Sequence, residues 1–299
     1  AFEQIKLGNQ FNDSTKIITA YKTALVKFPK DIWLKREYAI LLAKNNESEE
    51  AIKIYKNLVL ELGDQSYAWH EFALLFSEEE LDLPIGMLSK AIKLQKDENF
   101  LGSTRLDLAD KLIKKNKLEE ALVELNKYQE YRIANNKNLS DKFNELKVLV
   151  KEVQTHKKDN LELYDEYIIV SENFAYQDIS WTELVFIEKW KNDINKERLS
   201  FTNGNNLSLS INANRFSILK NIEVGQVVKF KLHNKLVEDK IKLHHFKHEY
   251  YPLLAEISDK PKWSCLEDTI AVVDYINVEK NIVHAISSDN KEVFFPMEK

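Results

Sequence analysis

A helical pattern that recurs every 34 to 36 residues constrains the fold of this 299-residue chain more than any other feature. Residues 31–63 hold two runs of apolar residues at helical three-and-four spacing, separated by a polar segment at 44–48. The first inward position of the second run recurs along the chain, at Ile17, Ala51, Ile85 and Ala121. Because one helical hairpin cannot bury its apolar face alone, this period predicts stacked hairpins.

A pattern of large, small and aromatic residues recurs in three hairpins, as in Tyr38-Ala39 with Tyr55, Trp69 with Phe72-Ala73, and Leu108-Ala109 with Tyr128. This pattern resembles that of tetratricopeptide repeats. Gly63 stands where the family has Pro, and Pro84 opens a helix. The match covers about the first half of the chain. It implies an α-solenoid whose concave groove binds a protein partner.

The family's groove positions fall on Trp33, Arg36, Ile40 and Lys44, then on Tyr67, His70 and Leu74, and then on Ser103, Asp110 and Lys114. Of these, Trp33, Arg36, Lys44, Tyr67 and His70 are the predicted binding residues. The mixed aromatic and basic set would suit an extended peptide with an acidic or C-terminal group. Ordinary packing between repeats is the alternative for the aromatic residues. The Lys and Asn set that some family members use to clamp a C-terminal carboxylate is not reproduced.

Composition excludes several classes of protein. No apolar run approaches the about 20 residues of a membrane helix, and no signal peptide is visible. The single cysteine, Cys265, cannot form an internal disulfide, so we expect a cytoplasmic protein. A net charge of −5 argues against bulk coating of nucleic acid. Because residue 1 is Ala within a helix-like opening, we expect a fragment of a longer chain.

The apolar period changes to two after about residue 180. Residues 139–156 predict one more helix that caps the last hairpin, and 161–174 either extend it or begin the crossing to the next domain. The predicted strands are 184–190, 198–202, 207–211, 227–232, 250–257, 269–276, 281–286 and 292–295, with 235–246 as a long loop. We expect domains at 1–176, 177–260 and 261–299: a helical repeat domain, one complete small barrel and the start of a second.

Residues 222–230 lead through Gly225 into a predicted strand, and 270–296 hold aromatic residues on successive strands. These segments resemble OB-fold barrels of the cold-shock or S1 type: the first is similar to the family's entry into its fourth strand, and the second to its first three strands. There Tyr275 stands for the family's Trp, Ile282 and His284 for two Phe, and Phe294 and Pro296 for a Phe and a His. The resemblance implies a stacking platform for unpaired bases.

The nucleic-acid-binding candidates are thus Tyr275, His284 and Phe294 in the second set, and Trp190, Arg198 and Ser200, flanked by Lys189, Lys191 and Lys196, in the first. Alternating aromatic residues on strands are also ordinary core residues, which is the structural alternative. RNA is the expected ligand ahead of DNA.

Patterns for catalysis and metal binding are missing from the sequence. There is no phosphate-cradling glycine motif, no nucleophile elbow and no Cys-x-x-Cys pair. His244, His245 and His248 invite a zinc interpretation, but solvated loop histidines fit them better. We therefore expect no enzyme activity, no cofactor and no metal.

Together these features predict a multidomain α-then-β protein: a tetratricopeptide-like α-solenoid followed by one complete and one partial OB-like barrel. The expected function is a non-enzymatic adaptor that holds a protein partner in the groove and single-stranded RNA or DNA on the barrels. The alternatives are a pure protein-interaction scaffold, or the regulatory part of a longer enzyme.

Overall fold

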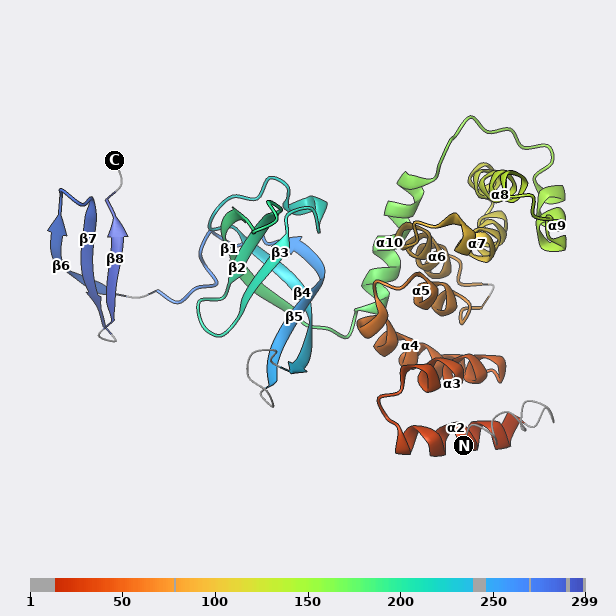
Figure 1. Ribbon diagram of the computed structural model, residues 1–299, viewed down its shortest axis with the longest axis horizontal. Coiled ribbons are helices and arrows are strands. Elements are labelled where there is room, and N and C mark those ends of the chain that lie inside the picture. Colours follow the sequence, from red (N-terminus) through yellow and green to blue (C-terminus); the bar gives the residue numbers. More distant parts are fainter. Residues whose placement is uncertain (1–13, 78, 239–245, 269, 289–290, 298–299) are drawn as a thin grey trace. The chain divides into compact units, whose positions relative to one another are not determined.

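The computed structural model describes residues 14–77, 79–238, 246–268, 270–288 and 291–297. The chain divides into two compact units, Ala1–Asp178 and Ile179–Lys299. The first is helical and the second is built from antiparallel strands (Figure 1). This confirms the predicted order of helices followed by sheets. The expected further boundary at 260/261 stays a prediction.

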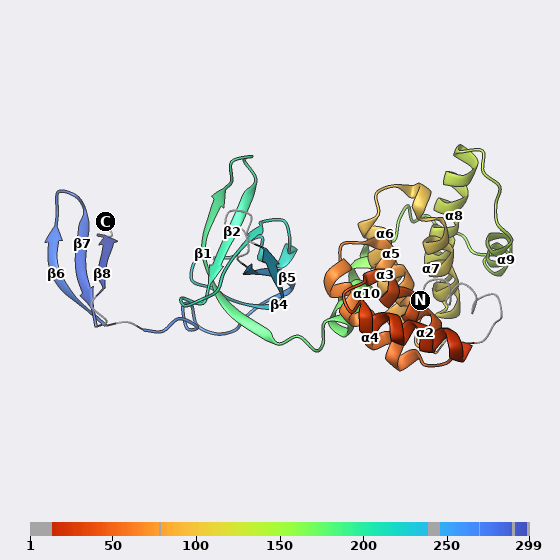
Figure 2. The ribbon, with the colours of Figure 1, turned by 60° about the horizontal axis from the view of Figure 1, so that its bottom comes forward.

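Helical hairpins build the first unit. Helix α3 pairs with α4, α5 with α6, and α7 with α8 (Figure 2). Among the described residues the helices are α2 (Ser14–Lys27), α3 (Ile32–Lys44), α4 (Ser48–Leu62), α5 (Ser66–Ala73), α6 (Asp82–Leu94), α7 (Gly102–Lys114), α8 (Leu118–Ala134), α9 (Asp141–Leu149) and α10 (Leu161–Ala175), with a short 3-10 helix, η1 (Glu98–Phe100), before α7. None of these helices combines the length and hydrophobicity that a membrane span requires.

Asparagine ends several of these helices. Asn46, Asn116 and Asn136 follow α3, α7 and α8 and have φ values of 64°, 59° and 51°. In this left-handed conformation the backbone N–H groups turn back to the last helical carbonyls, and asparagine tolerates it better than most residues. The polar segments that separate the apolar runs in the sequence are therefore the sharp turns of the hairpins.

Helix α10 returns to the middle of the unit and packs along α6. A Cβ atom at Gly86 of α6 would lie 2.1 Å from the carbonyl oxygen of Tyr167 and 2.8 Å from Oγ of Ser171, so only glycine allows this approach. Ion pairs from Lys90 to Glu172 and from Lys93 to Asp165 flank the contact. Residues 161–175 are thus a separate helix. The predicted helix at 139–156 ends at Leu149, because the residues after Val150 are polar except for Val153 and no longer form an apolar face.

A fully buried carboxylate links α7, α8 and α10. Glu124 has no exposed surface and accepts hydrogen bonds from Arg105 Nη1 at 2.5 Å, from Asn160 Nδ2 at 2.7 Å and from the Tyr164 hydroxyl. Arg105 also binds Glu98 through Nε, at 3.0 Å. Burial, together with contact with the Glu124 carboxylate, raises the pKa of Tyr164 far above its ordinary value. Buried charges in proteins need partners of this kind.

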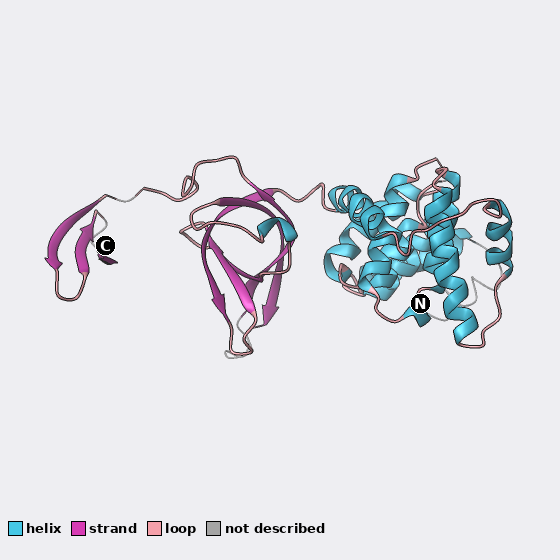
Figure 3. Cartoon of the chain, turned by 90° about the horizontal axis from the view of Figure 1, so that it is seen from above, coloured by secondary structure: helices cyan, strands magenta, loops and turns pink. Residues whose placement is uncertain are grey.

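A five-stranded antiparallel sheet of order β3-β2-β1-β4-β5 begins the second unit and curls into a nearly closed barrel (Figure 3). Its apolar interior includes Phe186, Phe201 and Phe230. Gly225 has φ +88°, and the Trp263 indole covers it so closely that a Cβ atom would lie 2.5 Å from Nε1. The strands are β1 (Trp181–Lys191), β2 (Glu197–Thr202), β3 (Ser208–Asn212), β4 (Val227–Glu238) and β5 (Phe246–Ile257), with the 3-10 helix η2 (Ser217–Leu219) between β3 and β4.

The predicted loop at 235–246 is wrong at both ends. Residues 235–238 continue β4, and Phe246 begins β5. This extension pairs Lys235 with Glu249 and Asn234 with Tyr250. Because its polar residues lie on both faces, it lacks the alternation from which strands were predicted. His244 and His245 lie outside the described residues.

A three-stranded antiparallel sheet completes the described part of the chain. It is formed by β6 (Ala271–Asn277), β7 (Ile282–Ser287) and β8 (Glu292–Pro296), in the order β6-β7-β8. These strands match the ones predicted from the sequence to within two residues.

Candidate nucleic-acid interface

Polar side chains cover the outer face of β2 and β3. Leu199 and Phe201 of β2 and Leu209 and Ile211 of β3 point into the barrel and are buried. Because neighbouring residues of a strand point to opposite faces, the residues between them point outward. This outer face consists of Arg198, Ser200, Thr202, Ser208, Ser210 and Asn212.

Trp190 and Arg198 lie opposite each other in the β1–β2 register, so the structure brings these two predicted residues to one face. Each is held by a serine of that face. Trp190 Nε1 donates to Ser200 Oγ at 2.8 Å, and Arg198 donates from Nε to Ser210 Oγ at 3.3 Å and from Nη2 to the Ser210 carbonyl. Trp190 is 39% exposed. The tryptophan ring and the guanidinium therefore stand on the surface in fixed positions.

Lys189 does not share this face. It pairs with Leu199, an inward residue of β2, and forms an ion pair with Glu197 at 2.9 Å. Its position next to Trp190 in the sequence places it on the opposite side of the strand.

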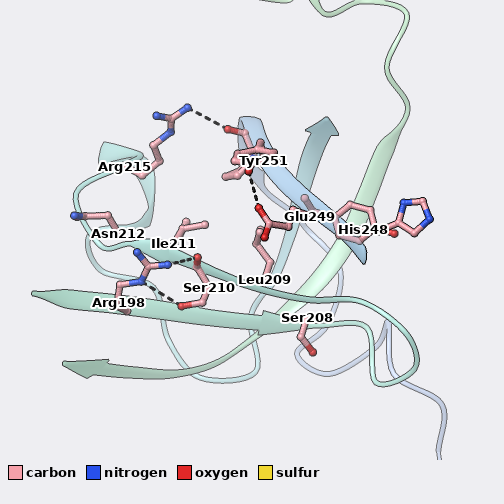
Figure 4. Close-up of a pocket in the computed structure, with 12 residues that line it drawn as sticks. Arg198, Ser208, Leu209, Ser210, Ile211, Asn212, Arg215, His248, Glu249 and Tyr251 are labelled. Atoms are coloured by element: carbon pink, nitrogen blue, oxygen red, sulfur yellow. Dashed lines mark hydrogen bonds between the residues drawn. The ribbon is translucent and has the colours of Figure 1, made fainter. Parts of the chain in front are cut away.

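A groove of about 530 Å³ separates β3 from β5, where the barrel is not closed by hydrogen bonds (Figure 4). Two guanidinium groups line it. Arg198 stands at one side, and Arg215, from the segment after β3, donates from Nη2 to the Pro252 carbonyl at 3.2 Å. The other lining residues are Ser208, Leu209, Ser210, Ile211, Asn212, His248, Glu249, Tyr250, Tyr251 and Pro252. The groove thus continues the polar outer face toward β5.

Arg215 and Tyr251 of this groove were not among the predicted site residues. The alternation in 207–212, LSLSIN, could have indicated the outward serines, but nothing in the sequence brings β5 beside β3. His248, considered above as a metal ligand, lies in β5, where its Nδ1 is 2.7 Å from Asn234 Oδ1. Within the described part of the chain, no three potential ligand residues form a metal site.

Tyr275, His284 and Phe294 form a ladder of rings across the three-stranded sheet. They occupy one register row, with centroids 4.8 Å apart from Tyr275 to His284 and 4.7 Å apart from His284 to Phe294. Tyr275 and Phe294 are 48% and 56% exposed, whereas His284 is buried between them. His284 Nδ1 lies 3.0 Å from Asp274 Oδ2, and Nε2 lies 3.9 Å from Glu292. Two carboxylates, of Asp274 and Glu292, therefore lie beside the ladder.

Trp33, Arg36 and Tyr67 of the predicted groove come together in the helical unit. The two rings are stacked, with centroids 6.3 Å apart, and the Arg36 guanidinium lies 4.4 Å from one centroid and 4.5 Å from the other. Arg36 is buried and forms a two-pronged ion pair with Glu71, which also accepts a hydrogen bond from Tyr55. The Arg36 side chain thus links α3 to α5 through Glu71, whereas Trp33 is 63% exposed.

His70 and Lys44 do not join that cluster. His70 Nε2 lies 2.6 Å from Asp107 of α7, and Nδ1 lies 3.2 Å from Thr104. Lys44 is the last residue of α3 and Trp33 the second, so about 16 Å of helix separates them. Among the predicted groove residues Trp33, Arg36, Lys44, Tyr67 and His70, the structure thus brings together two exposed aromatic rings, those of Trp33 and Tyr67.

Comparison with known proteins adds one match. The model of a family described as a domain of unknown function (DUF7017) matches residues 32–168. No curated protein matches the chain. The matched segment begins with α3 and ends within α10, so it lies inside the helical unit.

Proposed function

We propose that this protein binds single-stranded nucleic acid on the outer face of β1 to β3 and in the groove between β3 and β5. The observation that carries the proposal is the fixed pair of Trp190 and Arg198 on a face that is otherwise made of hydroxyl and amide side chains. An exposed ring stacks on any base, and a guanidinium binds the phosphate of the same or the next nucleotide.

The topology supports this proposal at the level of the fold. We propose that the five-stranded sheet is an OB-like barrel, because its order β3-β2-β1-β4-β5 needs only a β3–β5 contact to close. OB-folds bind oligonucleotides on the face of strands 2 and 3. Arg198 and the outward serines lie on that face of this sheet.

RNA is the proposed ligand ahead of DNA. Ser200, Ser208, Ser210 and Asn212 can each donate and accept hydrogen bonds. A 2′-hydroxyl also does both, and it is the group by which a protein distinguishes RNA from DNA. From residue 178 onward the chain has 17 Lys and Arg against 18 Asp and Glu. Few phosphates can then be neutralised, so binding should be modest and sensitive to salt.

The ring ladder of β6 to β8 is a second platform in this proposal. Tyr275 and Phe294 expose enough ring for bases to stack. Asp274 and Glu292 beside His284 repel phosphate, so the ladder should contribute less than the barrel face. Two weak sites on one chain raise the overall affinity for a strand that reaches both.

Fluorescence anisotropy with labelled single-stranded oligonucleotides tests the barrel site. Trp190→Ala and Arg198→Ala should each weaken binding about tenfold or more, since stacking contributes about 1–3 kcal/mol per base. Lys189→Ala is the matched control: it removes a positive charge next to Trp190 but from the other side of β1. Equal losses in Arg198→Ala and Lys189→Ala, with binding unchanged in Trp190→Ala, would point to unspecific charge attraction. Unchanged binding in the first two would refute the site.

Protein binding by the helical unit is the second candidate function. We propose that the hairpins are tetratricopeptide-like repeats and that the exposed Trp33–Tyr67 pair marks their docking surface for an extended peptide. The chain would then be an adaptor between that peptide and nucleic acid. A peptide selected against the full chain from a random library should lose binding to Trp33→Ala. Selected peptides that ignore this change would contradict the surface.

A further inference from the structure

One carboxylate stands in the proposed nucleic-acid groove. Glu249 lines the β5 side of the groove, whereas Arg198 stands at the opposite side (Figure 4). A carboxylate repels phosphate, but it can accept hydrogen bonds from the bases. Base edges that carry N–H donors are therefore the groups that this position can recognise.

The orientation of the carboxylate is fixed by its own strand. The Tyr251 hydroxyl donates to Glu249 Oε2 at 2.7 Å, and Figure 4 shows the two side chains next to each other. Lys235 lies opposite Glu249 in the β4–β5 register and offsets part of its charge. The Tyr251 hydroxyl occupies one of the about four acceptor positions of the carboxylate. Tyr251 is 44% exposed, which leaves an aromatic surface beside the carboxylate.

The four bases differ in what they offer a carboxylate. Guanine has two adjacent parallel donors, N1–H and the N2 amino group, which match the two carboxylate oxygens. Adenine and cytosine offer one amino group next to a ring-nitrogen acceptor. Uracil offers one N–H between two carbonyl oxygens, and these would repel Glu249. Guanine is the base with the best match.

We propose that Glu249 selects guanine from a single strand bound in the β3–β5 groove. The proposal rests on the proposed function of the barrel. Glu249 accepts the N1–H and N2 amino donors of an unpaired guanine, Tyr251 positions the carboxylate, and Arg198 and Arg215 bind the flanking phosphates. Specificity then comes from Glu249, and the affinity that is independent of sequence comes from Trp190, Arg198 and Arg215.

Competition binding with the full chain tests the selection. The probes are a labelled uridine hexamer, the same hexamer with one central guanosine, and a third with inosine, which lacks the N2 amino group. The guanosine hexamer should bind about tenfold more tightly than the uridine hexamer, as expected for one bidentate contact with a base, and inosine should fall between them. Because these probes change only the ligand, the result does not depend on the folding of a variant.

Glu249→Gln assigns the selection to the side chain. The variant should lose most of the preference for guanosine while it binds the uridine hexamer as well as, or better than, the wild-type protein. Tyr251→Phe keeps the carboxylate and should lose part of the preference. Arg198→Ala should weaken both hexamers equally.

Equal binding of the guanosine and uridine hexamers would overturn the role of Glu249 and leave the barrel site standing. A preference that persists in Glu249→Gln would overturn it too. Binding of no hexamer at low salt would refute the proposed function itself, and the guanine selection with it.

Discussion

Replacement of Glu124 by leucine tests whether the buried carboxylate holds the helical unit together. Leucine has nearly the same volume, so the substitution removes the acceptor without a large cavity. It leaves three donors without this partner, on Arg105, Asn160 and Tyr164. Each buried unsatisfied donor costs about 1–3 kcal/mol. Arg105 keeps Glu98, and the cost of burying Glu124 is recovered, so we expect a net loss of about 3–5 kcal/mol.

Urea unfolding followed by far-ultraviolet circular dichroism measures this loss, because the helical signal comes from the first unit. The control is the double variant Arg105→Met/Glu124→Leu, which removes both charges and replaces them with apolar groups of similar size. It should recover at least half of the lost free energy, because the buried guanidinium that has lost the Glu124 acceptor is no longer present. A loss below about 1 kcal/mol in Glu124→Leu, or no recovery in the double variant, would refute the assigned role of the network.

Two further perturbations concern the helical unit. Burial alone would raise the pKa of the Asp107 carboxyl, but hydrogen bonds from His70 and Lys142 outweigh it and hold the pKa below its ordinary value of 3.8. The stability that these contacts contribute is complete above that value and is lost as the pH falls through the folded-state pKa. At pH 7 the free energy of unfolding of Asp107→Asn, measured with urea, should therefore be about 1–2 kcal/mol lower than that of the wild type. This difference should vanish in acid. A constant difference at all pH values would contradict this. Gly86→Ala should destabilise the unit by about 1–3 kcal/mol despite alanine's better helix propensity, because its Cβ would meet the Tyr167 carbonyl oxygen. Gly102→Ala is the control, because a Cβ atom at that position would lie 3.4 Å from Tyr128 Cε2, an ordinary contact distance. The melting temperatures of the two variants compare their stabilities.

Local patterns predicted the elements well where one face is buried. The hairpins followed from apolar spacing and from turns such as 44–48, and the three strands of the ring ladder followed from alternation. The rings themselves were predicted from the resemblance to cold-shock strands. Lys189 shows the limit of sequence proximity, because residues adjacent in a strand point to opposite sides.

Contacts between distant segments were beyond the sequence patterns. The groove needs β3 and β5, which are more than thirty residues apart in the chain, to lie side by side. The packing of α10 on α6 depends on Gly86, which in the sequence is a glycine within a helix and gives no indication of its partner. Arg36 fitted a ligand groove by position, but its burial against Glu71 depends on how neighbouring hairpins stack.

The return of α10 to α6 also constrains how such a chain can evolve. In an open array of helical hairpins, duplication or loss of one hairpin changes the length and leaves each interface intact. Here α7, α8 and α9 lie between the two contacting helices, and Gly86 admits a neighbour only at Tyr167 and Ser171. An inserted or deleted hairpin between 95 and 160 would move α10 away from this position. The number of hairpins in that interval should therefore stay fixed among descendants of this sequence, whereas hairpins can be added or lost ahead of α3.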